Sequence, residues 1–302
     1  MNENNRRLHD LGQSLWVDNI TRGTLDDGTL KGYIEDLSVT GLTSNPTIFE
    51  KAIGGGNDYD AQIAELAASE SDPEQIFFEL AMADLRRAAD DFEEIHEKTD
   101  RVDGYVSLEV SPLLADDTEA TIAQAADLYE RIERKNVFIK IPGTPAGLPA
   151  IEETIFAGIP VNVTLLFSTE QYLAAADAYL KGVERRIEAG LNPAINSVAS
   201  LFISRWDAAV IDDVSPELRA KLGIAVGKQA YAAYRELIAS DRVQILANEG
   251  GRIQRLLMAS TGTKDPEASD VLYIEALAAP NTVNTMPPAA LEAYADHGVT
   301  GA

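Results

Sequence analysis

Eight short apolar segments recur along the chain, and most are separated by stretches with the apolar spacing of amphipathic helices. Alternating strands and helices form parallel sheets, and eight strands close a (β/α)8 barrel. We therefore predict an α/β fold, the (β/α)8 TIM barrel. The predicted strands are 15–18, 40–44, 105–111, 136–141, 159–167, 195–200, 255–260 and 281–285. The predicted helices are 74–98, 117–134, 146–157, 169–189, 202–212 and 216–240, with start signals at Asp72-Pro73, Asp116-Asp117 and Ser168-Thr169.

Length and composition fit a single domain. The chain has 302 residues, of which 45% are hydrophobic, and no linker, low-complexity tract or fixed-period repeat divides it. We therefore expect one barrel domain over residues 1–302.

Composition also excludes several classes of function. The absence of cysteine excludes disulfides, thiolate metal sites and a cysteine nucleophile. A formal net charge of −24 argues against nucleic-acid binding, because a phosphate backbone would be repelled. Without a signal peptide or a run near the roughly 18 apolar residues of a membrane span, we expect a cytoplasmic protein with no membrane partner. The three histidines (His9, His96 and His297) lack metal-triad spacing and are predicted at the surface, so no metal site is expected.

Side-chain alternation within three predicted strands separates an apolar set from a second, mostly polar set. In a barrel strand the apolar set faces the surrounding helices and the other set faces the axis. The predicted helix-facing residues are Val106, Leu108, Val110, Val137, Ile139, Ile141, Val161, Val163 and Leu165. On the other side we expect Glu109, Lys140, Asn162 and Thr164 to converge near the axis.

Polar side chains also stand near the carboxyl ends of seven predicted strands. Barrel enzymes build their active sites at this end, from strand termini and the loops that follow. The residues concerned are Asp18, Ser44, Asn45, Glu109, Lys140, Asn162, Thr164, Ser200 and Ser260. A ring of such groups predicts an active site.

Lys140 is the most unusual member, because Val137, Phe138, Ile139 and Ile141 surround it with no charge. Burial depresses the pKa of a lysine, and a neutral amine can attack a ketone to form an imine. Neighbouring carboxylates would serve the proton transfers. A structural salt bridge of Lys140 with Glu109 or Asp18 stays open at this point, as does a helix-capping role for Asp18.

A set of longer motifs carries a family resemblance. The motifs are WVDNITR (16–22), GLTSNPTIFEKAI (41–53), SLEVSP (107–112), NVFIKIPGT (136–144), GIPVNVTLLFS (158–168), SVASLFISRWD (197–207), LLMASTGTKDP (256–266) and NTVNTMP (281–287). With them the chain resembles the transaldolases, in their longer bacterial form, over nearly its whole length. The resemblance implies a cofactor-free (β/α)8 enzyme of the Schiff-base aldolase class.

The implied reaction belongs to the pentose phosphate pathway. A dihydroxyacetone unit moves from sedoheptulose 7-phosphate to glyceraldehyde 3-phosphate, which gives erythrose 4-phosphate and fructose 6-phosphate. Two alternatives stay open: a fructose-6-phosphate aldolase-like enzyme that releases free dihydroxyacetone, and a non-catalytic domain that binds sugar phosphates.

The resemblance also implies roles for individual residues. Lys140 would form the Schiff base, Asp18 would be the acid and base at the C4 hydroxyl, and Glu109 with Thr164 would hold and activate the catalytic water. The implied substrate-binding residues are Asn45, Asn162 and Ser200 at the dihydroxyacetone unit, Phe202 where free-dihydroxyacetone aldolases carry a tyrosine, and Arg205 and Ser260 at the phosphate. Phe202 as core packing and an Arg205–Asp207 pair are the plain structural alternatives.

Two departures from the family pattern stand out. Some transaldolases carry an arginine two residues after the serine matched by Ser260, whereas this chain reads ASTGTK, so Lys264 is the predicted replacement. The additional C-terminal helical segment of longer members is missing after ADHGVTGA. A truncated chain, a naturally short form, a fusion to glucose-6-phosphate isomerase and a homodimer all stay open.

Overall fold

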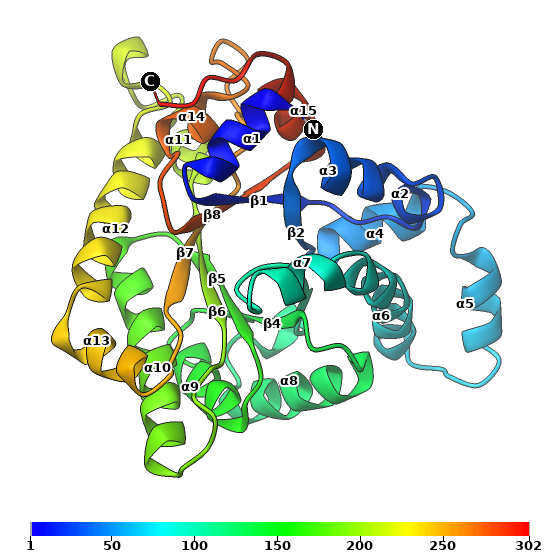
Figure 1. Cartoon of the computed structure of the whole chain (residues 1–302). Helices are drawn as coiled ribbons and strands as arrows, with labels where there is room; N and C mark the ends of the chain where they lie inside the picture. Colours follow the sequence, from blue (N-terminus) through cyan, green and yellow to red (C-terminus); the bar gives the residue numbers. More distant parts are fainter. Residues whose placement is uncertain (1, 302) are drawn as a thin grey trace.

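Eight parallel strands run through the computed structural model, which describes residues 2–301 (Figure 1). All eight predicted strands are present. They are β1 (Gln13–Asp18), β2 (Val39–Thr43), β3 (Val106–Glu109), β4 (Val137–Pro142), β5 (Val161–Leu166), β6 (Ser197–Phe202), β7 (Gln254–Ala259) and β8 (Thr282–Met286). Regular ladders join them in the order β2-β1-β8-β7-β6-β5-β4-β3.

The two end strands of this sheet, β2 and β3, meet along a seam that brings the barrel close to full closure. Two backbone hydrogen bonds cross it, from Leu42 N to the Tyr105 carbonyl and from Gly104 N to the Thr40 carbonyl, both 2.9 Å long. The seam is tight because β2 carries Gly41, where a Cβ atom would lie 2.7 Å from the Trp16 ring and from the Tyr105 carbonyl oxygen. The fold is the predicted (β/α)8 barrel.

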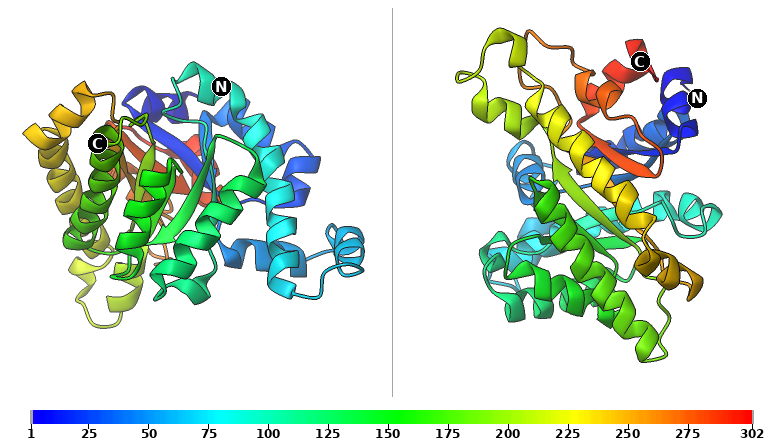
Figure 2. Two further views of the ribbon diagram at one scale, coloured as in Figure 1. Left: turned by 90° about the horizontal axis from the view of Figure 1, so that it is seen from below. Right: turned by 90° about the vertical axis from the view of Figure 1, so that its left-hand side faces the viewer.

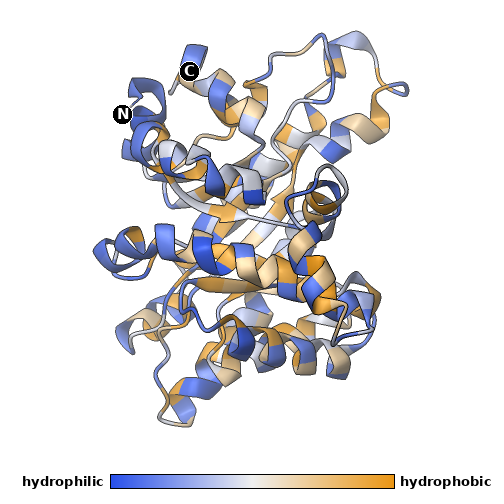
Figure 3. Cartoon of the chain, turned by 90° about the vertical axis from the view of Figure 1, so that its right-hand side faces the viewer, coloured by the Kyte–Doolittle hydropathy of each residue, from blue (hydrophilic) through white to orange (hydrophobic). Residues whose placement is uncertain are grey.

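Helices surround the strands (Figures 1 and 2). The predicted helical stretches correspond to α6 (Pro73–Asp91) with α7 (Glu93–Lys98), α8 (Thr118–Ile132), α9 (Gly147–Ala157), α10 (Thr169–Glu188), α11 (Ser204–Val210), and the short 3-10 turn η2 (Pro216–Leu218) with α12 (Leu222–Ile238). Asp72, Asp117 and Ser168 cap α6, α8 and α10 as predicted. In Figure 3 the helix ribbons alternate between hydrophilic and hydrophobic residues, as expected of helices with one buried face.

The sequence prediction did not include several further helices, most of them short. They are α1 (Glu3–Asp10), α2 (Arg22–Asp26), α3 (Thr29–Leu37), α4 (Pro46–Gly54), α5 (Asp60–Leu66), the 3-10 turn η1 (Pro112–Leu114), α13 (Asp241–Asn248), α14 (Leu272–Ala276) and α15 (Pro288–His297). No helix between residues 2 and 301 has the length and apolar character needed to cross a membrane.

The helix-facing prediction holds for β3 and β4 and fails at one residue of β5. Val161 and Val163 are fully buried among the helices, as predicted. The β5–β6 ladder then pairs Val163 with Ala199 and Leu166 with Leu201, so β5 contains one extra residue. This bulge reverses the alternation, and Leu166 takes the core position that was predicted for Leu165.

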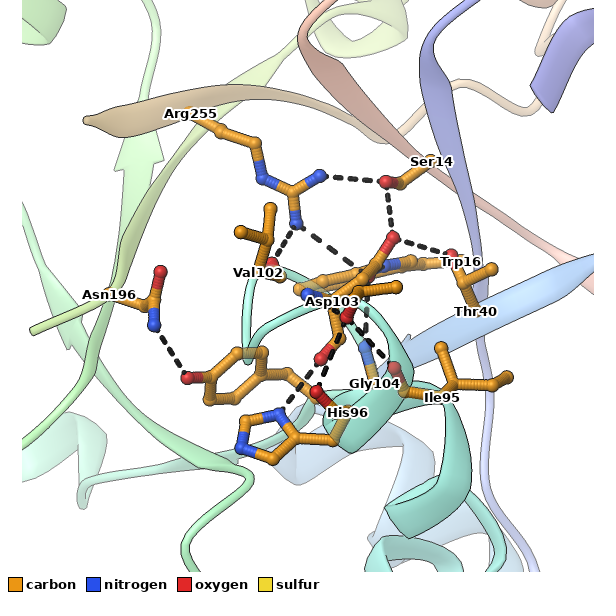
Figure 4. Close-up of polar contacts among 12 residues, drawn as sticks. Ser14, Trp16, Thr40, Ile95, His96, Val102, Asp103, Gly104, Asn196 and Arg255 are labelled. Atoms are coloured by element: carbon orange, nitrogen blue, oxygen red, sulfur yellow. Dashed lines mark hydrogen bonds and ion pairs between the residues drawn. The ribbon is translucent and has the colours of Figure 1, made fainter. Parts of the chain in front are cut away.

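At the amino ends of the strands, a buried carboxylate bonds to side chains from several strands (Figure 4). Asp103, in the loop before β3, accepts hydrogen bonds from Ser14 Oγ, from Thr40 Oγ1 at 2.9 Å and from Trp16 Nε1 at 2.8 Å. The Arg255 guanidinium lies 3.6 Å from the same carboxylate and donates to Ser14 Oγ. The carboxylate therefore links β1, β2 and β7 beside the seam.

His96 is buried beside this carboxylate, so its predicted surface position is wrong. Its ring packs edge-on against Tyr105 with 4.8 Å between centroids, and Nδ1 lies 2.9 Å from the Asp103 carbonyl oxygen. Burial lowers the pKa of the His96 imidazole. The imidazole is part of the support for the seam.

We predict that Asp103→Ala lowers the free energy of unfolding by about 3–5 kcal/mol, because it leaves a buried guanidinium without its carboxylate. Denaturant titration followed by circular dichroism measures this loss. Asp26→Ala is the matched control, since Asp26 pairs with Arg87 at the surface, and it should change the midpoint little. Equal losses in both variants would contradict a special role for Asp103.

Candidate active site

A cavity of about 670 Å³ opens at the carboxyl ends of the strands, and residues from all eight strands or their following loops line it. Of the predicted site residues, all but Ser44 and Asn162 are in its wall. They are Asp18, Asn45, Glu109, Lys140, Thr164, Ser200, Phe202, Arg205, Ser260 and Lys264. The barrel therefore brings together residues that are up to 246 positions apart (264 − 18) in the sequence.

Lys140 projects from β4 into the floor of this cavity. Parallel pairing sets it directly beside Glu109 of β3, and Lys140 Nζ lies 3.0 Å from Glu109 Oε2. Nζ also donates to the Ser44 carbonyl oxygen at 3.0 Å. The ion pair considered as an alternative is present, and it also supplies a carboxylate that can take the proton of the amine.

Asp18, the last residue of β1, is held by a chain of hydroxyl groups. Thr43 Oγ1 donates to Asp18 Oδ1 at 2.6 Å and lies 2.7 Å from Thr285 Oγ1. Burial raises the pKa of the Asp18 carboxyl, while the Lys140 ammonium and the Thr43 hydroxyl act in the opposite direction. The following helix is capped by Thr21, so Asp18 is not a helix cap.

Thr164 presents an unused hydroxyl at the end of β5. Within the described part of the chain, its Oγ1 is buried and has no hydrogen-bond partner. Thr164 and Glu109 line the same cavity. A buried hydroxyl with free hydrogen-bonding capacity, in a cavity that a carboxylate also lines, is suited to hold a water molecule.

The two asparagines have different positions. Asn162 is fully buried and lies outside the cavity wall, where it donates to Ser107 Oγ at 3.2 Å and accepts from Ser200 Oγ at 2.7 Å. Asn162 therefore supports Ser200. Its side chain is not among those that line the cavity. Asn45 lines the cavity, but its Oδ1 caps α4 by accepting from Ile48 N, which leaves its amide Nδ2 for a ligand.

Three cationic side chains line the mouth of the cavity. Arg205 lies with its guanidinium carbon 4.6 Å from the centre of the Phe202 ring. Lys264 lines the cavity, and its Nζ lies 4.0 Å from the point where a Cβ atom on Gly262 would stand. Lys51 of α4 is a third cation at this mouth, and sequence analysis missed it. Its spacing from Thr47 and Ile48, four and three residues earlier, would have placed all three on one helix face.

Among residues 2–301 none of these three cations forms a salt bridge with a carboxylate, although the charge of Lys264 acts on Asp18 and the chain carries a net charge of −24. The alternative partner for Arg205, Asp207, instead accepts from Leu222 N, Gly223 N and Tyr273 Oη. A mouth with unpaired cations favours an anionic ligand. Among the described residues, no cluster of three or more His, Cys, Asp or Glu side chains could hold a metal ion.

Comparison with known proteins gives a consistent family. The family described as "Transaldolase/Fructose-6-phosphate aldolase" matches residues 15–302. A protein of Saccharopolyspora erythraea named "Transaldolase" is 49% identical, over 98% of this chain and 82% of its own length. "Transaldolase" of Mycolicibacterium smegmatis is 48% identical, over 99% and 83%. "Transaldolase 2" of Nostoc punctiforme is 46% identical, over 95% and 80%.

The raised pKa of Asp18 predicts a stability change. The folded state holds this proton more tightly than the unfolded chain, whose aspartate pKa is the ordinary 3.8. The free energy of unfolding therefore falls as the pH rises from 3.8 through the pKa of the folded state. Asp18→Asn keeps an oxygen for Thr43 and removes that cost. We expect a higher melting temperature than wild type at neutral pH, and a shrinking gain as the pH falls toward 3.8.

Asp27→Asn is the control of opposite sign. Hydrogen bonding to Thr29 lowers the pKa of Asp27, so its carboxylate stabilises the fold above 3.8 and loses that effect as the pH falls. Its replacement should slightly lower the melting temperature at neutral pH. A melting temperature for Asp18→Asn at or below wild type at neutral pH would contradict the assignment.

Proposed function

The chain belongs to the transaldolase/fructose-6-phosphate aldolase family, and from this premise we propose that it is a transaldolase. It transfers a dihydroxyacetone unit from sedoheptulose 7-phosphate to glyceraldehyde 3-phosphate. The observation that carries the proposal is the buried Lys140 amine, 3.0 Å from the Glu109 carboxylate in a cavity that Asp18 also lines.

The first step is formation of a Schiff base. Lys140 gives its proton to Glu109, and the neutral amine attacks the C2 ketone of the donor. The carbinolamine then loses hydroxide as water, with Glu109 and the water held by Thr164 supplying and removing the protons. The unused Thr164 hydroxyl supports this role.

The second step is cleavage of the C3–C4 bond. The Asp18 carboxylate takes the proton of the C4 hydroxyl, C4 becomes the aldehyde of the leaving aldose phosphate, and the bonding electrons pass into the iminium to give an enamine. An acceptor aldehyde then enters, and the same steps run in reverse. A carboxyl whose pKa is raised by burial retains its proton and can return it to the acceptor oxygen.

Phosphate recognition is assigned to the mouth. The Arg205 guanidinium can bind a phosphate with two parallel hydrogen bonds, and Ser260 and Lys264 line the same side of the cavity. Lys51 adds positive charge from α4. These cations offset the repulsion that a chain of net charge −24 exerts on a phosphorylated sugar.

Transfer is favoured over release of free dihydroxyacetone by Phe202. The side chain lines the cavity and carries no hydroxyl that could orient a hydrolytic water at the imine. The proposal includes a cytoplasmic location, where sugar phosphates are metabolised.

Borohydride trapping tests the function directly. Incubation with fructose 6-phosphate and borohydride should leave a dihydroxyacetone-derived mass on Lys140 alone, as read by peptide mass mapping. Lys140→Met should abolish trapping and turnover but keep the fold, because an unbranched apolar chain suits this buried position. Lys135→Met, at an exposed lysine nearby, should behave as wild type. An adduct on Lys135 or Lys264 would overturn the mechanism.

The phosphate assignment predicts a difference between substrates. Arg205→Ala should raise the KM for fructose 6-phosphate by about 10- to 100-fold, since a hydrogen bond to a charged group contributes roughly 1.5–3 kcal/mol. Lys264→Ala should raise it less. Steady-state kinetics with unphosphorylated fructose should show little change in either variant, and Lys228→Ala, at an exposed lysine of α12, should match wild type with both sugars. Equal losses with both sugars would show that Arg205 is structural.

A further inference from the structure

Leu165 has a backbone conformation that leucine rarely adopts. It follows Thr164 at the carboxyl end of β5 and has φ of 59°, in the left-handed region that disfavours residues with a Cβ atom. Its side chain lines the active-site cavity and is 37% exposed. Strained residues persist where the surrounding structure holds them, and they cluster at functional sites.

The bulge is the cause of this geometry. An extra residue between Val163 and Leu166 lets both Thr164 and Leu165 face the cavity, while Leu166 turns into the core. The neighbouring strand end accommodates the change, because a Cβ atom on Gly143 would lie 2.4 Å from Leu166 Cδ2. Gly143 of KIPGT therefore leaves the space that Leu166 of NVTLLF occupies because of the bulge.

Hydrogen bonds hold the strained segment on both sides. Gly143 N donates to the Thr164 carbonyl oxygen at 2.8 Å, just before Leu165. Trp206 Nε1 donates to the Phe167 carbonyl oxygen at 2.8 Å, two residues after it. The backbone between these two hydrogen bonds has little freedom to relax, so the Leu165 side chain stays in the cavity wall.

The residues that line the cavity follow an order along the chain. On five of the eight strand-and-loop segments, an apolar lining residue follows a polar one by one to three positions. These apolar residues, which we call the collar, are Pro46, Pro112, Leu165, Phe202 and Pro287. The cations Lys51, Arg205 and Lys264 come later still on three of the segments. On the segments of β2 and β6, the collar residue stands between the polar floor residue and the cation in the order of the chain.

We propose that Leu165 is a specificity-determining residue that keeps bulk water from the three-carbon imine on Lys140 and so favours transfer over release. This inference rests on the proposed function. Release requires protonation of the enamine at C3, addition of water to C2, and breakage of the C2–N bond with return of a proton to nitrogen. That water replaces the one lost when the imine formed, and the products are free dihydroxyacetone and the Lys140 amine.

The test compares wild type with Leu165→Asn, Leu165→Gly and Leu165→Met. Asparagine and glycine tolerate the left-handed backbone, so neither should lower the melting temperature. Both should raise several-fold the ratio of dihydroxyacetone released from fructose 6-phosphate to dihydroxyacetone transferred to erythrose 4-phosphate. Leu165→Met keeps an apolar side chain and should retain the wild-type ratio. Phe202→Tyr, which places a phenol in the same collar, is the reference for increased release.

The outcomes separate this inference from the proposed function. Borohydride trapping on Lys140 should persist in all four variants, which shows that the imine still forms. Failure of trapping in wild type would defeat the proposed function itself. With trapping intact, an unchanged release-to-transfer ratio in Leu165→Asn and Leu165→Gly would overturn the role of Leu165. Equal loss of both reactions would also overturn it, because a purely structural residue would give that result.

Discussion

Closure of the seam between β2 and β3 is the constraint on which the site depends. Lys140 Nζ donates to the carbonyl oxygen of Ser44, which follows β2, while Lys140 itself lies on β4 beyond the seam. Ser44 Oγ in turn donates to the Ser107 carbonyl oxygen of β3 at 2.7 Å. If the seam opened, the amine would lose one of its two hydrogen-bond acceptors. The Asp103 network at the amino ends of the strands therefore acts on the same seam that orients the lysine at the carboxyl ends.

The charged side chains on the buried floor of the cavity have partners that reduce the free-energy cost of burying them. A lysine and a glutamate beside each other satisfy one another at 3.0 Å, and Thr43 and Thr285 hold Asp18 without adding charge. Burying Asp18 still has a cost, expressed as its raised pKa. Sites that need a proton donor and acceptor in one place commonly accept such a cost. The unpaired cations stay at the solvent-exposed mouth, where their desolvation cost is small and an anionic ligand can reach them.

Much of the fold and of the site could be predicted from the sequence because side-chain alternation in a parallel barrel is regular. It gave the direction of Glu109, Lys140 and Thr164 correctly, and also that of Asn162, which pairs with Lys140 in the β4–β5 ladder. Alternation carries no information on exposure, so it could not show that Asn162 is covered and bonded to Ser107 and Ser200. It also fails at a bulge, which explains the error at Leu165. Lys51 was missed because its helix is short and follows a strand directly. The burial of His96 depends on contacts with a loop that no local pattern encodes.

The order of residues along each strand explains how one barrel can host both transfer and aldol cleavage. Imine formation and C–C cleavage need only the polar floor, which the first residues of each strand-end motif supply. Phosphate binding needs only the cations farthest along the chain. What remains, the lifetime of the three-carbon imine, depends on the collar between them, through the hydroxyl that Phe202 lacks and the strained side chain of Leu165. Phe202 packs against Arg205, whereas the apolar side chain of Leu165 can form no ion pair or hydrogen bond, so a change at Leu165 can alter the fate of the intermediate without rebuilding the chemistry that forms it.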